Sequence, residues 1–349
     1  MEMLKAKSLA DPDLGILEIG TSVHGLHLYA FPMGTGKRKV LMWSQMHGNE
    51  STTTKAVWDM VNFLRSSEPL ATAILSQCRL MIVPMLNPDG ALAYTRENLN
   101  LVDLNRDAQA QTQPESRAIA RLFESFAPDH CFNLHDQRTL FGAGRSGKVA
   151  TVSFLSPASD PERVLTPNRI AAMQLIAAMS DHLQQWIPGQ IGRFDDGFNA
   201  NCIGDTFQMA GVPTILFEAG HYPGDYDREK TREYIFHALL KALETIAGDG
   251  HGQYAAQDYF AIPENEKLFF DILVRDPGAI NPVLRGQKLG IRYREELRGG
   301  KIEFVPEIAD IGPLVGHFGH LELEAVDCKE FGWGIDYEKI VKLIRQAGK

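Results

Sequence analysis

Short runs of apolar and small residues alternate with helical segments over the first 250 residues of the chain. The runs lie at 40–43, 80–83, 131–134, 150–155 and 214–217, and short runs of this kind are typical of buried strands. Between them, apolar positions recur about every three to four residues, which predicts amphipathic helices. The helices lie at 51–64, 114–126, 168–186 and 227–246. This alternation predicts an α/β domain with a largely parallel, helix-covered sheet.

The pattern differs near both ends of the chain. Residues 14–31 predict two strands joined by a turn at 20–24. After the glycine-rich segment 248–252, the pattern predicts short strands separated by Gly, Pro and Asn, followed by a helix. These strands lie at 268–274, 289–293, 302–305 and 321–325, and the helix lies at 337–346. We therefore expect two domains, an α/β domain over residues 1–250 and a small β-rich domain over residues 253–349.

Charge and cysteine content limit the partners and the cellular location. The 349 residues carry 35 basic and 44 acidic side chains, a net charge of −9, with no run of Lys or Arg. We therefore expect neither nucleic acid nor a membrane surface as a partner, and no membrane span is predicted. The cysteines are scattered, at Cys78, Cys131, Cys202 and Cys328. Scattered thiols and the absence of a visible signal segment predict a cytoplasmic protein, and the oligomeric state is not indicated.

Polar residues follow three of the predicted strands, at the edge where open α/β sheets bind their ligands. His47 and Glu50 come after one strand, His135 follows a second, and Glu218 follows a third. A His-x-x-Glu pair alone is more often a hydrogen-bonded histidine with a glutamate at a helix start. Its position after a buried strand, together with a second strand-end histidine, favours a functional site.

Two imidazoles and one carboxylate form the donor set of a catalytic zinc site that keeps one coordination position open. His47 and Glu50 would come from one loop and helix start, and His135 from a separate strand. The open position would hold water, whose pKa the metal lowers until hydroxide is available near neutral pH. Glu218 would then be the general base that takes a proton from this water and passes it to the leaving amine.

The segment between the candidate ligands contains two arginines that suit an anionic substrate. Asn-Pro-Asp-Gly occupies 87–90, and Arg96 and Arg106 follow. One guanidinium can hold a carboxylate through two hydrogen bonds, and the other can stabilise the oxyanion of a tetrahedral transition state. The residues alone do not assign these two roles.

Taken in order, these elements resemble the zinc metallocarboxypeptidases typified by pancreatic carboxypeptidase A. The matching elements are His47-x-x-Glu50, Asn-Pro-Asp-Gly at 87–90, Arg96, Val-Asp-Leu-Asn-Arg at 102–106, His135 and Glu218. They span about residues 40–245. The β-rich segment beyond them would make the chain a bacterial-type member with a C-terminal appendage. The resemblance implies a mixed, mostly eight-stranded sheet sandwiched between helices.

The resemblance also implies the chemistry of the site. One zinc ion per chain would be bound by His47, Glu50 and His135, and Glu218 would be the general base. The implied activity is zinc-dependent hydrolysis of the C-terminal amide bond of a peptide, or of another small substrate that ends in a carboxylate.

Four further residues take roles from the same resemblance. Arg96 would polarise the scissile carbonyl and stabilise the oxyanion. Asn105 and Arg106 would bind the terminal carboxylate of the substrate. Asp103 would orient a zinc histidine, because a ligating histidine usually donates its other N–H to a carboxylate or carbonyl.

The sequence departs from this family at the loop before Glu218. The substrate-capping tyrosine should lie near 189–201, but that stretch offers Phe194 and Phe198 and no tyrosine. Asp205, or the pair Asp195 and Asp196, would favour a basic leaving residue.

Two alternative functions remain open at this stage. The appendage is also consistent with a deacylase of small N-acyl amino acids, of the aspartoacylase and succinylglutamate desuccinylase type. The alternative from another class is a non-catalytic zinc-binding or peptide-binding protein, which typically lacks the base.

Overall fold

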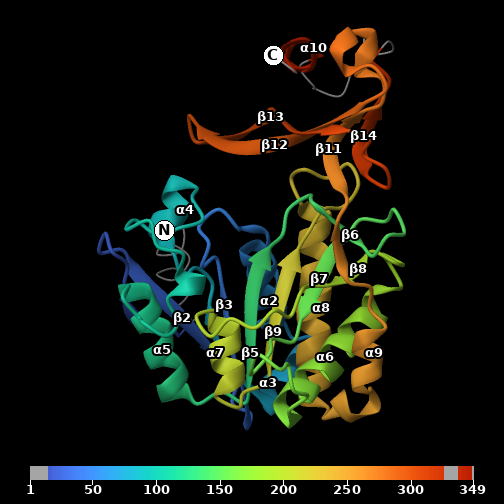
Figure 1. Ribbon diagram of the computed structural model, residues 1–349. Helices are drawn as coiled ribbons and strands as arrows, with labels where there is room; N and C mark the ends of the chain where they lie inside the picture. Colours follow the sequence, from blue (N-terminus) through green and yellow to red (C-terminus); the bar gives the residue numbers. More distant parts are fainter. Residues whose placement is uncertain (1–14, 326–336, 348–349) are drawn as a thin grey trace. The chain divides into compact units, whose positions relative to one another are not determined.

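The computed structural model describes residues 15–325 and 337–347, and these form two compact units (Figure 1). The first unit comprises Met1–Gln137 and Ala150–Asn265, and the second comprises Arg138–Val149 and Glu266–Lys349. The segment 138–149 groups with the second unit, although the sequence pattern placed it in the first predicted domain. The predicted domain limits stay a prediction. Cys328 lies outside the described residues.

An eight-stranded mixed sheet forms the centre of the first unit, in the order β1-β2-β4-β3-β5-β9-β7-β8. The strands are β1 (Leu17–Thr21), β2 (His27–Met33), β3 (Arg38–Ser44), β4 (Cys78–Val83), β5 (His130–Asp136), β7 (Val152–Leu155), β8 (Ile191–Arg193) and β9 (Thr214–Ala219). The four central strands β4, β3, β5 and β9 are parallel, as is the edge pair β7 and β8. The remaining pairs are antiparallel. The predicted fold class, an eight-stranded mixed sheet between helices with a β-rich C-terminal part, is confirmed.

Helices cover both faces of this sheet. The helices are α2 (Thr52–Leu64), α3 (Pro69–Gln77), α4 (Pro88–Ala93), α5 (Pro114–Phe126), α6 (Pro167–Leu183), α7 (Ile203–Met209), α8 (Glu229–Ala247) and α9 (Ala256–Phe260). Because side chains alternate along a strand, β5 serves two apolar clusters. Phe132 and Leu134 belong to the larger cluster, with α2, α6 and α8, whereas Cys131 belongs to the smaller one, with α5 and α7.

The sequence pattern located the long elements well and missed several short ones. The helix predicted at 114–126 is α5 with the same bounds, and the predicted buried strands correspond to β3, β4, β5, β7 and β9. The expected loop at 189–201 contains β8, and α3, α4 and α7 were not predicted. Asn-Pro-Asp-Gly at 87–90 begins α4: the Asn87 side chain accepts the Gly90 N–H and Pro88 takes the first helical position.

The second unit contains two small sheets. β6 (Phe141–Ala143) pairs with β10 (Asn265–Lys267). The other sheet has the order β13-β12-β11-β14 and comprises β11 (Phe269–Val274), β12 (Lys288–Arg298), β13 (Lys301–Gly312) and β14 (Phe318–Leu323). Helix α10 (Tyr337–Gln346) contributes Ile340 and Ile344 to the apolar cluster of this sheet. Within the described ranges, no helix combines the length and apolar character needed to cross a bilayer.

Phe217 shows how strongly the central sheet depends on its apolar packing. It is fully buried on β9, with its ring 5.2 Å from that of Phe132 and 5.3 Å from that of Phe154, measured between centroids. We expect F217A to lower the free energy of unfolding by about 3–5 kcal/mol, because the cavity cannot collapse between two fixed rings. Urea denaturation measures this. The control L92A removes a side chain that is 63% exposed and should change stability by less than about 0.5 kcal/mol. Equal effects of the two substitutions would contradict the packing argument.

Candidate metal centre

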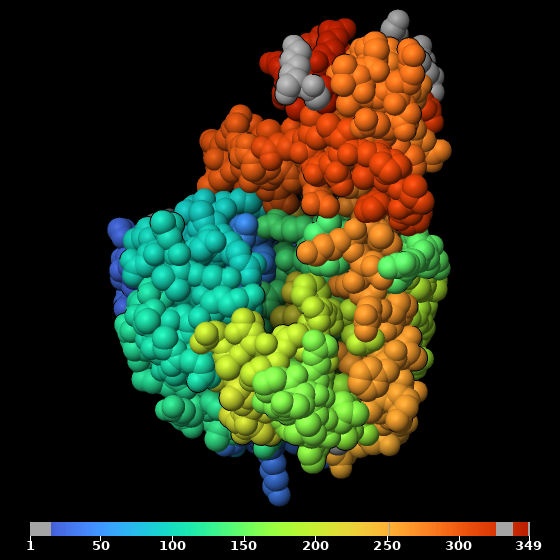
Figure 2. Space-filling view, in the orientation of Figure 1, coloured from blue at the N-terminus to red at the C-terminus, as the bar shows by residue number. Residues whose placement is uncertain are grey.

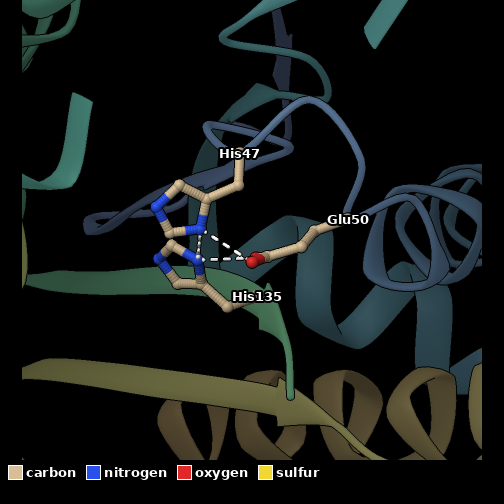
Figure 3. Close-up of side chains that lie close together, drawn as sticks. All are labelled: His47, Glu50 and His135. Carbon is tan, nitrogen blue, oxygen red and sulfur yellow. Dashed lines mark hydrogen bonds and ion pairs between the residues drawn. The ribbon is translucent and has the colours of Figure 1, made fainter. Parts of the chain in front are cut away.

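Three candidate ligands come together where β3 and β5 end (Figure 3). His47 lies in the loop that follows β3, Glu50 precedes α2, and His135 is the next-to-last residue of β5. All three side chains are buried. They point toward one another because β3 and β5 are adjacent parallel strands, so their carboxyl ends meet at one edge of the sheet.

The ligand atoms of these residues lie within contact distance of one another. His47 Nδ1 is 2.8 Å from Glu50 Oε1, and His135 Nδ1 is 2.9 Å from Glu50 Oε2. The two Nδ1 atoms are 3.0 Å apart. Two ring nitrogens that face each other at this distance can share only one proton between them, whereas a cation satisfies both.

The donor set fits zinc. Zn²⁺ binds histidine nitrogen and carboxylate oxygen at about 2.0–2.2 Å, and three donors this close can share one ion. The other ring nitrogen of His47 lies 3.0 Å from Asp103 Oδ1, as expected for a ligating histidine held by a carboxylate. His135 Nε2 has no such support: it is buried and has no hydrogen-bond partner among the described residues.

The ligand loop is fastened to the start of α4 by a close backbone approach. A Cβ atom on Gly48 would lie 2.0 Å from the carbonyl carbon of Gly90, so only glycine fits at position 48. The Asn49 N–H donates to the Thr95 carbonyl at 3.0 Å. On the other side of the loop, the Gln45 amide donates to the Gly48 carbonyl at 2.7 Å. These contacts hold in place the loop that carries His47.

Asp103 and Arg96 join the same network. Arg96 Nε and Nη2 lie 3.1 and 3.0 Å from Asp103 Oδ2, and Arg96 Nη1 lies 3.3 Å from Glu50 Oε1. Burial works against ionisation of Asp103, but the hydrogen bond to His47 and the charges of His47 and Arg96 hold its pKa well below the usual range. The Arg96 side chain is 41% exposed, so its guanidinium also reaches solvent.

Asn105 and Arg106 follow Asp103 in the short 3₁₀ segment Leu104–Arg106. The Asn105 side-chain oxygen accepts the Ile203 N–H at 3.1 Å and so fixes this segment to the start of α7. Arg106 Nη1 donates to the Asn105 carbonyl at 2.7 Å and lies 3.1 Å from Cys202 Sγ. Cys202 and Arg106 are 96 positions apart, so no local sequence pattern reveals this contact.

Glu218 lies beside the candidate ligands on the next strand. It is paired with His135 in the parallel register of β5 and β9, so the two side chains lie on the same face of the sheet. It is 8% exposed. Burial, followed by the negative charges of Glu50 and Asp136, raises the pKa of Glu218 well above its usual range. A divalent cation would offset this concentration of negative charge.

The loop expected to carry a capping residue is held by ion pairs. Asp196 binds Arg163 at 2.9 Å and also pairs with the buried Arg169. Its carboxylate is therefore already neutralised within the protein. Asp205, at the start of α7, is also buried, and that burial raises its pKa to about 6. The loop contains Phe194 and Phe198 where the family resemblance implied a tyrosine.

We expect H47A to weaken zinc binding by at least about 100-fold, because loss of a direct ligand should cost more than loss of an outer partner. Elemental analysis after dialysis against a weak chelator measures zinc per chain. H182A, on the outer helix α6, is the matched control and should keep its zinc. Unchanged zinc content in folded H47A would show that His47 is not a ligand.

Comparison with known proteins finds carboxypeptidases that are similar in sequence or in fold. Carboxypeptidase 2 of Trichophyton rubrum is 29% identical over 111 residues, which is 31% of this chain and 20% of that protein. The chain thus matches about a fifth of the length of that curated relative. A metallo-carboxypeptidase from Burkholderia cenocepacia has a similar fold, with 18% identity, a TM-score of 0.57, and coverage of 71% of this chain and 68% of its own.

A second solved structure extends the likeness in fold. It is a Pseudomonas aeruginosa metallo-carboxypeptidase in complex with (2-guanidinoethylmercapto)succinic acid, at 18% identity and a TM-score of 0.56, covering 72% of this chain and 68% of its own. Residues 1–201 match the zinc carboxypeptidase family, and this match includes the three candidate ligands, Arg96 and the 102–106 segment. The predicted family and its zinc cofactor are thereby confirmed, and the chain belongs to the zinc carboxypeptidase family.

Proposed function

We propose that this protein is a zinc-dependent hydrolase that removes the C-terminal residue of a peptide. The observation that carries the proposal is the convergence of His47, Glu50 and His135 beside Glu218, which shares a face and a register position with His135. A metal-binding triad next to a buried carboxylate is an arrangement that supports metal-assisted amide hydrolysis. Membership of the family supports the same reaction class.

The chain's own residues would divide the chemistry between them. Zinc at this site supplies Lewis acidity, which lowers the pKa of water and polarises a carbonyl. Glu218 would accept a proton from the attacking water and deliver it to the leaving amine, a role that suits a carboxylate held against the ligand cluster. Asp103 would keep His47 in one ring orientation through its hydrogen bond to Nε2.

Arg96 would stabilise the oxyanion that forms at the scissile carbonyl. Its guanidinium contacts both Glu50 and Asp103, which keeps a positive charge beside the ligand cluster. Its partial exposure leaves N–H groups for an incoming substrate. A fixed positive charge at this position favours the transition state over the neutral ground state.

Arg106 and Asn105 would bind the substrate's terminal carboxylate. Arg106 is exposed apart from its contacts with the Asn105 carbonyl and Cys202, and the bond from Asn105 to α7 holds the segment in place. In the space-filling view, the surface of the first unit is hollowed between teal and yellow-green segments (Figure 2). An exposed guanidinium suits a substrate that ends in a carboxylate.

Neither alternative function is favoured. The relatives named above are carboxypeptidases, and none is described as a deacylase. A non-catalytic reading is not supported either, because Glu218 is present beside the ligands. We further propose a cytoplasmic location, which the free thiols of Cys78, Cys131 and Cys202 support.

We expect E218Q to bind zinc like the parent protein and to lose about 10²- to 10⁴-fold in kcat, because the amide cannot accept the proton. Peptide hydrolysis is measured together with zinc content. E115Q is the matched control: Glu115 is fully buried on α5, away from the ligands, and the change there should leave kcat intact. An E218Q protein that retains turnover, or that loses its zinc, would remove Glu218 from the role of base.

Two peptides that differ only at the C-terminus test the proposed substrate class. We expect the free acid to be cleaved and the amidated form to be cleaved poorly. R106A should lower kcat/KM for the free acid by about 10- to 100-fold, the value of one or two charge-assisted hydrogen bonds. The control R117A removes an exposed arginine that likewise donates to backbone carbonyls. Equal cleavage of the acid and the amide by the parent enzyme would contradict the carboxylate clamp.

A further inference from the structure

Helix α2 begins without a cap from its own sequence. Its N-cap residue Ser51 makes no side-chain hydrogen bond to the first turn, and that turn contains no acidic residue. The first amides of a helix have no partner within the helix, so a buried helix start requires acceptors from elsewhere. This requirement bears on the metal centre, because Glu50 directly precedes the N-cap residue of the helix.

The missing acceptor is supplied from another strand. Asp136, the last residue of β5, accepts the Thr52 N–H at Oδ2 (3.0 Å) and the Thr53 N–H at Oδ1 (3.3 Å). Asp136 is buried, with 5% of the residue exposed. The negative charge therefore lies at the positive end of the helix dipole, where it is stabilised.

The same residue binds the candidate ligand in the reverse direction. The Asp136 backbone N–H donates to Glu50 Oε2 at 3.1 Å, and this oxygen also lies 2.9 Å from His135 Nδ1. The end of β5 and the start of α2 are thus joined by three hydrogen bonds that run both ways. Glu50 is held at its carboxylate and also through the helix that follows it.

Strand geometry separates Asp136 from the ligands themselves. Successive side chains of a strand point to opposite faces, so Asp136 faces the side of the sheet covered by α2 while His135 faces Glu218. Asp136 is therefore not one of the ligands, and its side chain bonds the helix that follows Glu50.

We propose that Asp136 is a positioning residue that holds Glu50 and His135 at metal-binding distance before the ion arrives. This inference rests on the proposed metal centre. In it, the hydrogen bonds of Asp136 order the ligands before zinc binds. A ligand set that is already fixed binds its metal with less loss of conformational freedom. Without the carboxylate, two of the three hydrogen bonds between β5 and α2 are lost and only the backbone bond to Glu50 remains, so the metal must do more of the work of bringing the ligands together.

Asp107 provides a matched control within the same unit. It is also buried, and it accepts the Thr112 N–H and the Gln113 N–H at 2.9 Å each just before α5. It therefore fastens a helix start with the same number of backbone bonds, but it has no contact with a candidate ligand in the described interactions.

The experiment compares D136A, D136N, D107A and D107N with the parent protein. Zinc affinity is measured by competition with a chromogenic chelator, and folding of the metal-free protein by circular dichroism and thermal unfolding. We expect D136A to weaken zinc binding by about 10- to 100-fold, the usual effect of removing a partner that holds a ligand. D136N should fall in between, because its amide keeps one uncharged acceptor oxygen. Both Asp107 variants should stay within about twofold of the parent, because the Asp107 carboxylate bonds the start of α5 and no candidate ligand in the described interactions.

Each other outcome counts against the proposal. A folded D136A protein that binds zinc like the parent would overturn it, as would equal weakening by the Asp107 and Asp136 variants. Failure of D136N to fold while D107N folds would also overturn it, because Asp136 would then be a determinant of folding.

The zinc titration separates this proposal from the function proposed above. A parent protein that binds zinc but cleaves no peptide would refute the activity and leave the role of Asp136 intact. A parent protein that binds no zinc would refute both.

Discussion

Two imidazole nitrogens and a carboxylate lie within 3.0 Å of one another in the interior of the first unit. The rest of the site depends on how this concentration of buried polar atoms is compensated. Ionised and polar groups are costly to bury unless they are paired or bind a metal. Here Asp103 forms a hydrogen bond with His47. Glu50 accepts hydrogen bonds from Arg96 and from the backbone N–H of Asp136. A cation at the centre would complete the compensation.

The parallel arrangement of the central strands is the reason the ligands could be anticipated. Strands β3, β5 and β9 present their carboxyl ends at one edge, so polar residues that follow apolar runs must meet there. This is why His47, His135 and Glu218 were recognisable without coordinates. The long helices were equally accessible, because their apolar positions repeat over many turns and the signal accumulates.

Other parts of the site depend on contacts that leave no local pattern. The three-residue strand β8 and the seven-residue helix α7 are too short for a periodic signal, yet α7 supplies the N–H that anchors Asn105. Asn-Pro-Asp-Gly carries the residues of a turn and those of a capped helix start at once, and tertiary context selects the helix. The bonds from Asp136 to α2 span more than 80 positions, so only the folded chain reveals them.

The contact between Gly48 and Gly90 has a consequence for local opening of the protein. Because the two backbones touch, and because Asn49 is bonded to Thr95 across the same junction, the ligand loop and the segment leading to Arg96 cannot separate independently. They should exchange their amide hydrogens as a single cooperative unit. Any fluctuation large enough to release the metal would then also displace the arginine, so the protein would lose its cofactor and its oxyanion-binding group in one event.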